Sequence, residues 1–224
     1  MNSVESKPNV KFKPVTIISN TEISPNVFLL SFKRDFAFKA GQVLGLAVSP
    51  NDDARLYSIA SGENDENIAI LYNIKPGGKL TPNLAILKPA DTLWITVPFG
   101  TYTGSSEPAY WIAAGTGIAP FYSMYRSGLG GNKMLVHGSR TLDAFYFGDE
   151  LIRDFGSRYV RCCSQQQGEG VYTGRVTQYL EEIDDLPEDQ KYYLCGSAEM
   201  VVECREILLR KGIAFSNIVA EIYF

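Results

Sequence analysis

YWIAAGTGIAP, residues 110–120, is the stretch that decides the fold of this chain. Its first five residues form an apolar run of strand length, residues 115–117 form a Gly-Thr-Gly turn, and a helical pattern continues to about Arg126. A strand, a glycine turn and a helix in direct succession begin a β–α unit, whose strands pair in parallel. The stretch therefore predicts a parallel sheet covered by helices.

The residues that follow continue this alternation. With the strand at 110–114, the pattern gives a five-stranded parallel α/β domain with helices on both faces. The further strands are predicted at 133–138, 159–164, 192–195 and 218–223, and the further helices at 143–155, 176–183 and 199–211.

The residues before position 100 have another pattern, with short β-branched or aromatic runs separated by Gly, Pro, Asn and Asp. Their spacing predicts a six-stranded antiparallel barrel, with a short helical turn at 80–87. The polar stretch 103–108 is the predicted linker, so we expect an N-terminal domain of residues 1–104 and a C-terminal domain of residues 105–224. The six runs are residues 10–19, 27–32, 42–48, 56–60, 68–74 and 92–97.

Composition limits the classes of function. Of 224 residues, 45% are apolar and 21% are charged, and 25 acidic against 21 basic side chains give a formal net charge of −4. This balance argues against nucleic acid as a partner, because phosphate binding needs clustered excess Lys and Arg. No apolar run reaches the roughly 18–20 residues that span a bilayer, and residues 1–14 lack an apolar signal core. We expect a cytoplasmic protein that binds no membrane.

Cysteine and histidine usage argues against a metal site. The cysteines at 162, 163, 195 and 204 form no C-x-x-C pair, and His137 is the only histidine. A structural zinc or iron–sulfur site needs more such ligands at closer spacing. We therefore expect no metal, and free thiols in a reducing compartment.

Three motifs carry residue types suited to a phosphate group. Arg55-Leu56-Tyr57-Ser58 lies where a turn becomes a strand, and Arg55 and Tyr57 share one face. Glycines in Gly77-Gly78-Lys79-Leu80-Thr81 free backbone N–H groups before a helical turn. The turn at 115–117 does the same before a longer helix, although Pro120 stands where a third glycine completes the dinucleotide fingerprint. Taken singly, a surface arginine, a hairpin turn and an ordinary helix start remain the alternatives.

Taken in order, the motifs resemble one family. They are R-L-Y-S at 55–58, G-G-K-L-T-P-N-L at 77–84, G-T-G-I-A-P at 115–120, C-G-S-A-E-M at 195–200 and A-E-I-Y-F at 220–224. This series resembles the ferredoxin–NADP⁺ reductase superfamily, most closely the bacterial ferredoxin/flavodoxin–NADP⁺ reductases that end in an aromatic pair. The resemblance covers nearly the whole chain and implies an FAD-binding barrel followed by an NADP(H)-binding α/β domain.

The resemblance also implies roles for residues around the flavin. Arg55 would bind the flavin pyrophosphate, Ser58 would hydrogen-bond near flavin N5, and Tyr223 would stack on the flavin face. Cys195 would contact the nicotinamide as a small polarizable group rather than act as a nucleophile. The implied catalytic residues are Ser58, Cys195, Glu221 and Tyr223. The implied FAD-binding residues are Arg55, Leu56, Tyr57, Ser58, Tyr72, Gly78, Lys79, Leu80, Thr81, Thr116, Tyr223 and Phe224.

A second implied set binds the nicotinamide dinucleotide. Arg140 and Arg175 would hold the 2′-phosphate of NADPH between two guanidinium groups. The sequence departs from the family at Gln165, because relatives often carry an arginine after the equivalent of Ser164. The implied NADP-binding residues are Gly115, Thr116, Gly117, Ser139, Arg140, Arg175, Cys195 and Gly196.

The implied reaction is hydride transfer between NADP(H) and FAD N5, followed by single-electron transfer to or from a ferredoxin or flavodoxin. We expect that carrier to be a separate protein and the reductase to be a monomer. Two alternatives remain. One is an NAD(P)H-dependent flavin reductase or the reductase component of an oxygenase, and the other is a flavin-binding relay subunit that turns nothing over alone.

Overall fold

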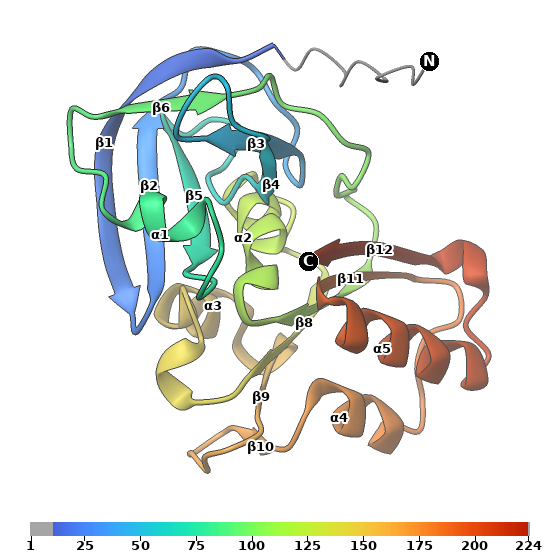
Figure 1. Cartoon of the computed structure of the whole chain (residues 1–224). Coiled ribbons are helices and arrows are strands. Elements are labelled where there is room, and N and C mark those ends of the chain that lie inside the picture. The colour runs from blue at the N-terminus through green and yellow to red at the C-terminus, as the bar shows by residue number, and fades with distance from the viewer. Residues whose placement is uncertain (1–10, 224) are drawn as a thin grey trace, which may run out of the picture.

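Two six-stranded sheets carry the fold in this computed structural model, which describes residues 11–223 (Figure 1). The first sheet is antiparallel, in the order β4-β3-β6-β1-β2-β5. Its two edges meet through an antiparallel bridge between Ile59 and Ile70, which closes the predicted barrel. The strands are β1 Lys13–Ser24, β2 Val27–Lys33, β3 Val43–Ala47, β4 Arg55–Ser58, β5 Asn67–Asn73 and β6 Thr92–Ile95.

Alternation of side chains fills the barrel. In β5, Ile68, Ile70 and Tyr72 are buried in one core cluster, as the period of two in a strand requires. The predicted helical turn is present as α1, Thr81–Ala85, and its Leu84 is buried in the same core. The side-chain amide of Asn20 in β1 donates to the carbonyl of Leu84 at 2.8 Å, which ties α1 to the barrel wall.

The second sheet is parallel throughout, in the order β10-β9-β8-β7-β11-β12. Alternate residues of β7 face opposite layers, because Trp111 packs with α2 and α3 and Ile112 packs with α4 and α5. No helix within residues 11–223 is long and apolar enough to cross a membrane. The elements are β7 Ala109–Ala114, α2 Ala119–Arg126, β8 Lys133–Ser139, α3 Gly148–Phe155, β9 Tyr159–Cys163, β10 Tyr172–Thr173, α4 Val176–Glu182, β11 Lys191–Ser197, α5 Ala198–Arg210 and β12 Ile218–Tyr223.

Two predictions for this sheet need correction. The predicted five strands are six, because β10 pairs in parallel with β9 through only Tyr172 and Thr173, too few residues to leave a pattern in the sequence. The helix predicted at 143–155 is interrupted. A short 3₁₀ turn at Leu142–Ala144 precedes α3, and Phe147, immediately before α3, adopts a left-handed backbone with a φ of 61°.

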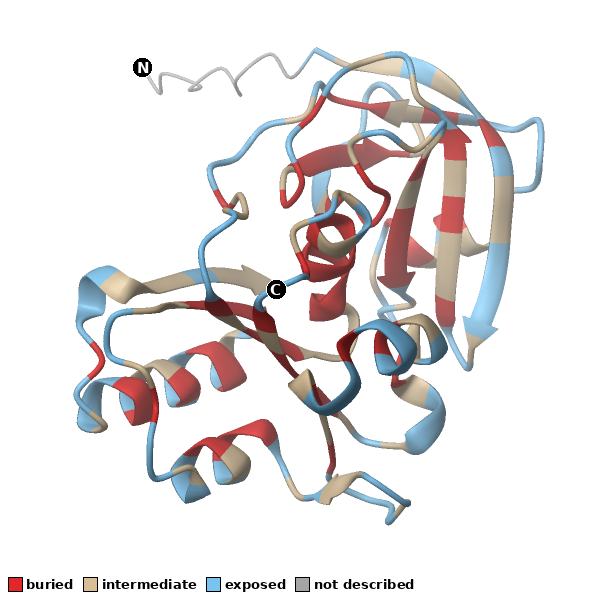
Figure 2. Cartoon of the chain, turned by 180° about the vertical axis from the view of Figure 1, so that it is seen from behind, coloured by how far each residue is buried: buried red, intermediate tan, exposed pale blue. Residues whose placement is uncertain are grey.

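A shared apolar core joins the two sheets. One cluster contains Val27, Ala60 and Leu71 from the barrel together with Trp111 and Phe121 from the second domain. Figure 2 shows α2 buried between the barrel and the parallel sheet. Because domain interfaces that bury large apolar side chains resist relative motion, this core fixes how the two domains face each other.

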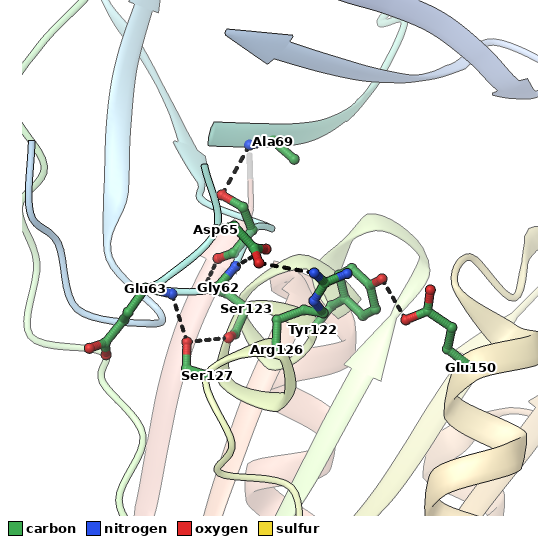
Figure 3. Close-up of polar contacts among 10 residues, drawn as sticks. Gly62, Glu63, Asp65, Ala69, Tyr122, Ser123, Arg126, Ser127 and Glu150 are labelled. Carbon is green, nitrogen blue, oxygen red and sulfur yellow. Dashed lines mark hydrogen bonds and ion pairs between the residues drawn. The ribbon is translucent and has the colours of Figure 1, made fainter. Parts of the chain in front are cut away.

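Polar contacts surround that core and are drawn in Figure 3. The Ser123 hydroxyl on α2 donates to the carbonyl of Ser61 at 2.6 Å, and the backbone N–H of Glu63 donates to the Ser127 hydroxyl at 3.0 Å. Arg126 pairs with Asp65 at 2.9 Å. The segment after β4 is therefore bonded to the helix after the Gly-Thr-Gly turn, which couples the two motif-bearing regions.

Candidate functional site

Three of the four residues predicted to be catalytic meet where the domains face each other. The Ser58 hydroxyl at the end of β4 donates to Glu221 Oε2 at 2.9 Å. The Tyr223 hydroxyl in turn donates to Ser58 Oγ at 2.8 Å. Ser58 is separated from Glu221 and Tyr223 by more than 160 residues, so only the tertiary fold brings them together. In Figure 1 the carboxyl end of β12 points toward the barrel.

Strand register adds the fourth residue. In the parallel pair β11–β12, Cys195 lies opposite Glu221, and Tyr223 follows two residues later on the same face of β12. Cys195 is fully buried, and burial raises the pKa of its thiol well above the ordinary range. The thiol therefore stays protonated at neutral pH, which is incompatible with a thiolate nucleophile and compatible with a small polarizable contact.

Burial raises the pKa values of two acidic groups in this cluster. Burial raises the pKa of Glu221, and the hydrogen bond from Ser58 opposes that shift. Burial also raises the pKa of Tyr223 well above its ordinary value. A carboxyl group whose pKa is raised by burial, beside a serine hydroxyl, is a candidate for proton transfer to or from a reacting group.

The outer side of β4 fits a planar ring that carries phosphates. β4 is the edge strand of the barrel sheet, the Arg55 side chain is exposed, and Leu56 is 57% exposed. Tyr57 is half-buried, and burial raises its pKa to about 12. An exposed guanidinium group, a neutral phenol ring and the Ser58 hydroxyl in succession form a donor set suited to the pyrophosphate and ring of a flavin.

Other residues predicted to bind FAD lie one layer further in. Tyr72 is 1% exposed, and its hydroxyl donates to Asn20 Oδ1 at 2.9 Å inside the barrel. Tyr72 touches Tyr57 edge-on, with ring centroids 6.4 Å apart, so it supports that ring from behind. Leu80 is buried in the barrel core. In this structure, neither Tyr72 nor Leu80 presents a surface to the outer side of β4.

The turn at 75–81 is built around its glycines. A Cβ on Gly78 would lie 2.9 Å from the Lys75 carbonyl oxygen, so the turn has no room for a side chain there. The Thr81 hydroxyl accepts a hydrogen bond from the Lys75 N–H at 2.8 Å and thereby braces the turn. Lys79 is exposed. Phe224, the last residue predicted to bind FAD, lies outside the described residues.

The Gly-Thr-Gly turn connects β7 to α2, as predicted. Gly115 has a φ of 54°, in the left-handed region that glycine adopts readily. A Cβ on Gly117 would lie 2.3 Å from the Cys195 carbonyl oxygen, so only glycine lets this turn approach β11 so closely. Gly115, Thr116 and Gly117 therefore lie beside the Cys195-Gly196 end of β11.

His137 forms a hydrogen bond to this turn from the neighbouring strand β8, a role that its sequence context does not indicate. It is fully buried in β8, and burial lowers its pKa to about 4. Its Nε2 lies 3.3 Å from the Gly115 carbonyl oxygen and its Nδ1 lies 3.0 Å from the Tyr159 hydroxyl. Since a carbonyl only accepts, the neutral ring donates from Nε2 to Gly115 and accepts from Tyr159.

The residues predicted to bind the 2′-phosphate gather at the carboxyl edge of the parallel sheet. The loop after β8 and the loop after β9 are joined by the Gln165 N–H, which donates to the Arg140 carbonyl at 3.0 Å. Arg140 and Arg175 are exposed, and neither forms an ion pair within residues 11–223. The Ser139 hydroxyl, by contrast, donates to the Thr141 carbonyl at 2.7 Å.

Two family descriptions match the two halves of the chain. Residues 14–103 match the oxidoreductase FAD-binding domain, and residues 111–206 match the oxidoreductase NAD-binding domain. The ferredoxin–NADP reductase B of Sorangium cellulosum is 32% identical over 85% of this chain and 88% of its own length. The electron transfer component of toluate 1,2-dioxygenase from Pseudomonas putida is 29% identical over 89% of this chain, which spans 64% of that protein.

A solved structure shows the same fold. The ferredoxin NADP⁺ reductase from Neisseria gonorrhoeae, determined with FAD and NADP, superimposes with a TM-score of 0.86 at 21% identity. The similarity covers 96% of this chain and 99% of that one. Both domains and their order are therefore shared along nearly the whole length.

Proposed function

Because the chain belongs to the ferredoxin–NADP⁺ reductase superfamily of FAD- and NAD-binding oxidoreductases, we propose that it transfers electrons between NADP(H) and a ferredoxin or flavodoxin. The observation that carries this proposal is the hydrogen-bonded series Glu221–Ser58–Tyr223 across the domain interface. The chemistry supplied by bound FAD is the conversion of a two-electron hydride transfer into single-electron transfers.

The residues of this chain bind, orient and hold protons around that chemistry. Arg55 would neutralise the flavin pyrophosphate, and Tyr57 would pack against the isoalloxazine ring. Ser58 offers a hydroxyl at the end of β4, and Glu221, whose pKa burial raises, accepts a hydrogen bond from that hydroxyl. Tyr223 covers the place where the nicotinamide ring is to stack, so it has to move aside first. Cys195 stays a neutral thiol and bounds the same place.

The test begins with the purified protein. Its absorbance and mass spectrum should show bound FAD, and anaerobic NADPH should bleach the flavin bands. Ser58→Ala should keep FAD and lower kcat about 10–150-fold, the effect of losing a hydrogen bond to a charged group. Ser31→Ala is the matched control, because Ser31 bonds Ser19 at 2.6 Å within the barrel wall. A colourless protein that neither FAD nor FMN reconstitutes would refute the proposal. A bound flavin that neither nucleotide reduces would favour a relay subunit.

A second candidate function is the reductase component of an oxygenase, which uses NADH. Its supporting observation is the similarity to the toluate 1,2-dioxygenase component over 89% of this chain, together with Gln165 in the 2′-phosphate loop. The comparison of kcat/KM with NADPH and with NADH separates the two functions. Preference for NADPH with reduction of ferredoxin or flavodoxin supports the first, and preference for NADH supports the second.

A further inference from the structure

Tyr102 carries a buried hydroxyl that has no hydrogen-bond partner within residues 11–223. The residue is 6% exposed and lies in the connection between the barrel and β7. Buried polar groups in folded proteins are almost always hydrogen-bonded, and an unpaired one lowers stability. An unpaired hydroxyl beside a binding site is therefore a candidate for contact with a ligand.

The ring of Tyr102 is held firmly in place. It packs edge-on against Tyr193, with centroids 5.7 Å apart, and against Phe121, with centroids 6.2 Å apart. A Cβ on Gly41 would lie 2.1 Å from the Tyr102 carbonyl oxygen, so the backbone is tightly enclosed as well. The hydroxyl cannot turn toward bulk water without disrupting these contacts.

The surroundings of this hydroxyl are those of the candidate site. Tyr102 belongs to the same core cluster as Cys195, and Tyr223 packs against that cluster. Burial raises the pKa of Tyr102 well above its ordinary value, and the nearby Cys195, Glu221 and Tyr223 raise it further. Tyr102 therefore stays protonated and is available as a hydrogen-bond donor.

We infer that the Tyr102 hydroxyl donates to the carboxamide oxygen of the nicotinamide ring when Tyr223 moves aside. This inference rests on the proposed function, because it requires the nicotinamide to enter beside Cys195. A carboxamide oxygen is a neutral acceptor that suits a neutral phenol, and it gives the buried hydroxyl the partner that residues 11–223 do not provide. Tyr102 is then a binding residue for the reacting half of the dinucleotide.

Tyr102→Phe removes only the hydroxyl oxygen atom. We expect it to raise thermal stability and to lower kcat/KM for NADPH. The melting temperature without nucleotide should rise by about 2–4 °C, because an unpaired buried hydroxyl is gone. The kcat/KM for NADPH should fall about tenfold, and FAD content should not change. Tyr192→Phe is the matched control. Its hydroxyl donates to the Pro187 carbonyl at 2.9 Å on the other face of the sheet, so this variant should lose stability and keep its nucleotide kinetics.

Equilibrium binding measurements show which part of the nucleotide Tyr102 contacts. In a Tyr223→Ser background, Tyr102→Phe should weaken NADP⁺ about tenfold and leave 2′,5′-ADP, which lacks the nicotinamide, unchanged. An unchanged affinity for NADP⁺, with the melting temperature raised, would assign Tyr102 a purely structural role and overturn the inference. Equal weakening of both ligands would also overturn it. If the unsubstituted protein binds FAD but neither nucleotide, the proposed function itself fails.

Discussion

Between pH 7 and pH 5, His137 should cost the unsubstituted protein about 2 kcal/mol of its free energy of unfolding. The His137→Gln variant should not lose this amount. His137 is fully buried, and its pKa falls from 6.5 to about 4 on folding because burial disfavours the charged ring. Between these two values the unfolded chain binds a proton that the folded chain does not. The contribution of neutral His137 to the free energy of unfolding is therefore fully present above pH 6.5 and is lost progressively as the pH falls toward 4.

The magnitude follows from the size of the shift. One pKa unit corresponds to about 1.36 kcal/mol, so the loss amounts to about 2 kcal/mol at pH 5 and about 3 kcal/mol at pH 4. Carboxyl groups such as Glu221, whose pKa is raised by burial, are present in both proteins. The difference between the two pH profiles isolates the contribution of His137.

The assay is urea unfolding of the FAD-loaded protein at half-unit steps from pH 7.5 to pH 4.5. His137→Gln should be less stable than the unsubstituted protein at pH 7, because the bonds to Gly115 and Tyr159 are disturbed, and the two should converge as the pH falls. The KM for the nucleotide should rise, since the Gly115 carbonyl loses its support. Parallel pH profiles for the two proteins would refute the reasoning.

Three further predictions concern the site and the domain interface. Tyr223→Ser with Phe224 removed should bind NADP⁺ about tenfold more tightly and shift the flavin absorption bands, whereas unchanged bands and affinity would remove Tyr223 from the site. Arg140→Ala should lower kcat/KM for NADPH about 10–150-fold and spare NADH; an equal loss with both would contradict its contact with the 2′-phosphate. Ser123→Ala should lower the free energy of unfolding in urea by about 1–3 kcal/mol, because the buried Ser61 carbonyl loses its donor. Asp65→Asn, which weakens the more exposed pair with Arg126, should lower it by at most about 1 kcal/mol. A larger loss for Asp65→Asn than for Ser123→Ala would contradict this reasoning.

The sequence predicts the fold well because its strands and helices are strongly periodic. The apolar run at 110–114 and the glycines at 115 and 117 are sufficient to predict β7, the turn and α2. The two residues of β10 are too few to show a period, and only their parallel pairing with Cys162 and Cys163 makes them a strand. Local sequence patterns predict the longer helices and strands. The formation of a short edge strand depends on pairing with a neighbouring strand, which the local sequence does not show.

The candidate site is less accessible to sequence reasoning. Motif resemblance selects Ser58, Glu221 and Tyr223, and the structure brings them within hydrogen-bonding distance, while their roles remain predictions. The same resemblance selects Tyr72, which the structure places in the barrel core behind Tyr57. The unpaired hydroxyl of Tyr102 has no counterpart in any local pattern, because pairing is a property of the packed structure.

We expect movement in the site at Tyr223 rather than at Ser58 or Cys195, because these two residues are held by buried contacts. Ser58 is 2% exposed and Cys195 is fully buried, whereas Tyr223 is half-buried at the end of the edge strand β12. Its hydroxyl bond to Ser58 contributes about 0.5–1.5 kcal/mol, so we expect an open conformer that loses only this bond to be populated at about 7–30%. We propose that the nucleotide binds only that conformer, which lowers its apparent affinity in proportion to the open population. On this proposal, a stronger Tyr223–Ser58 bond weakens nicotinamide binding and promotes release of the oxidised nucleotide, and a weaker bond does the reverse.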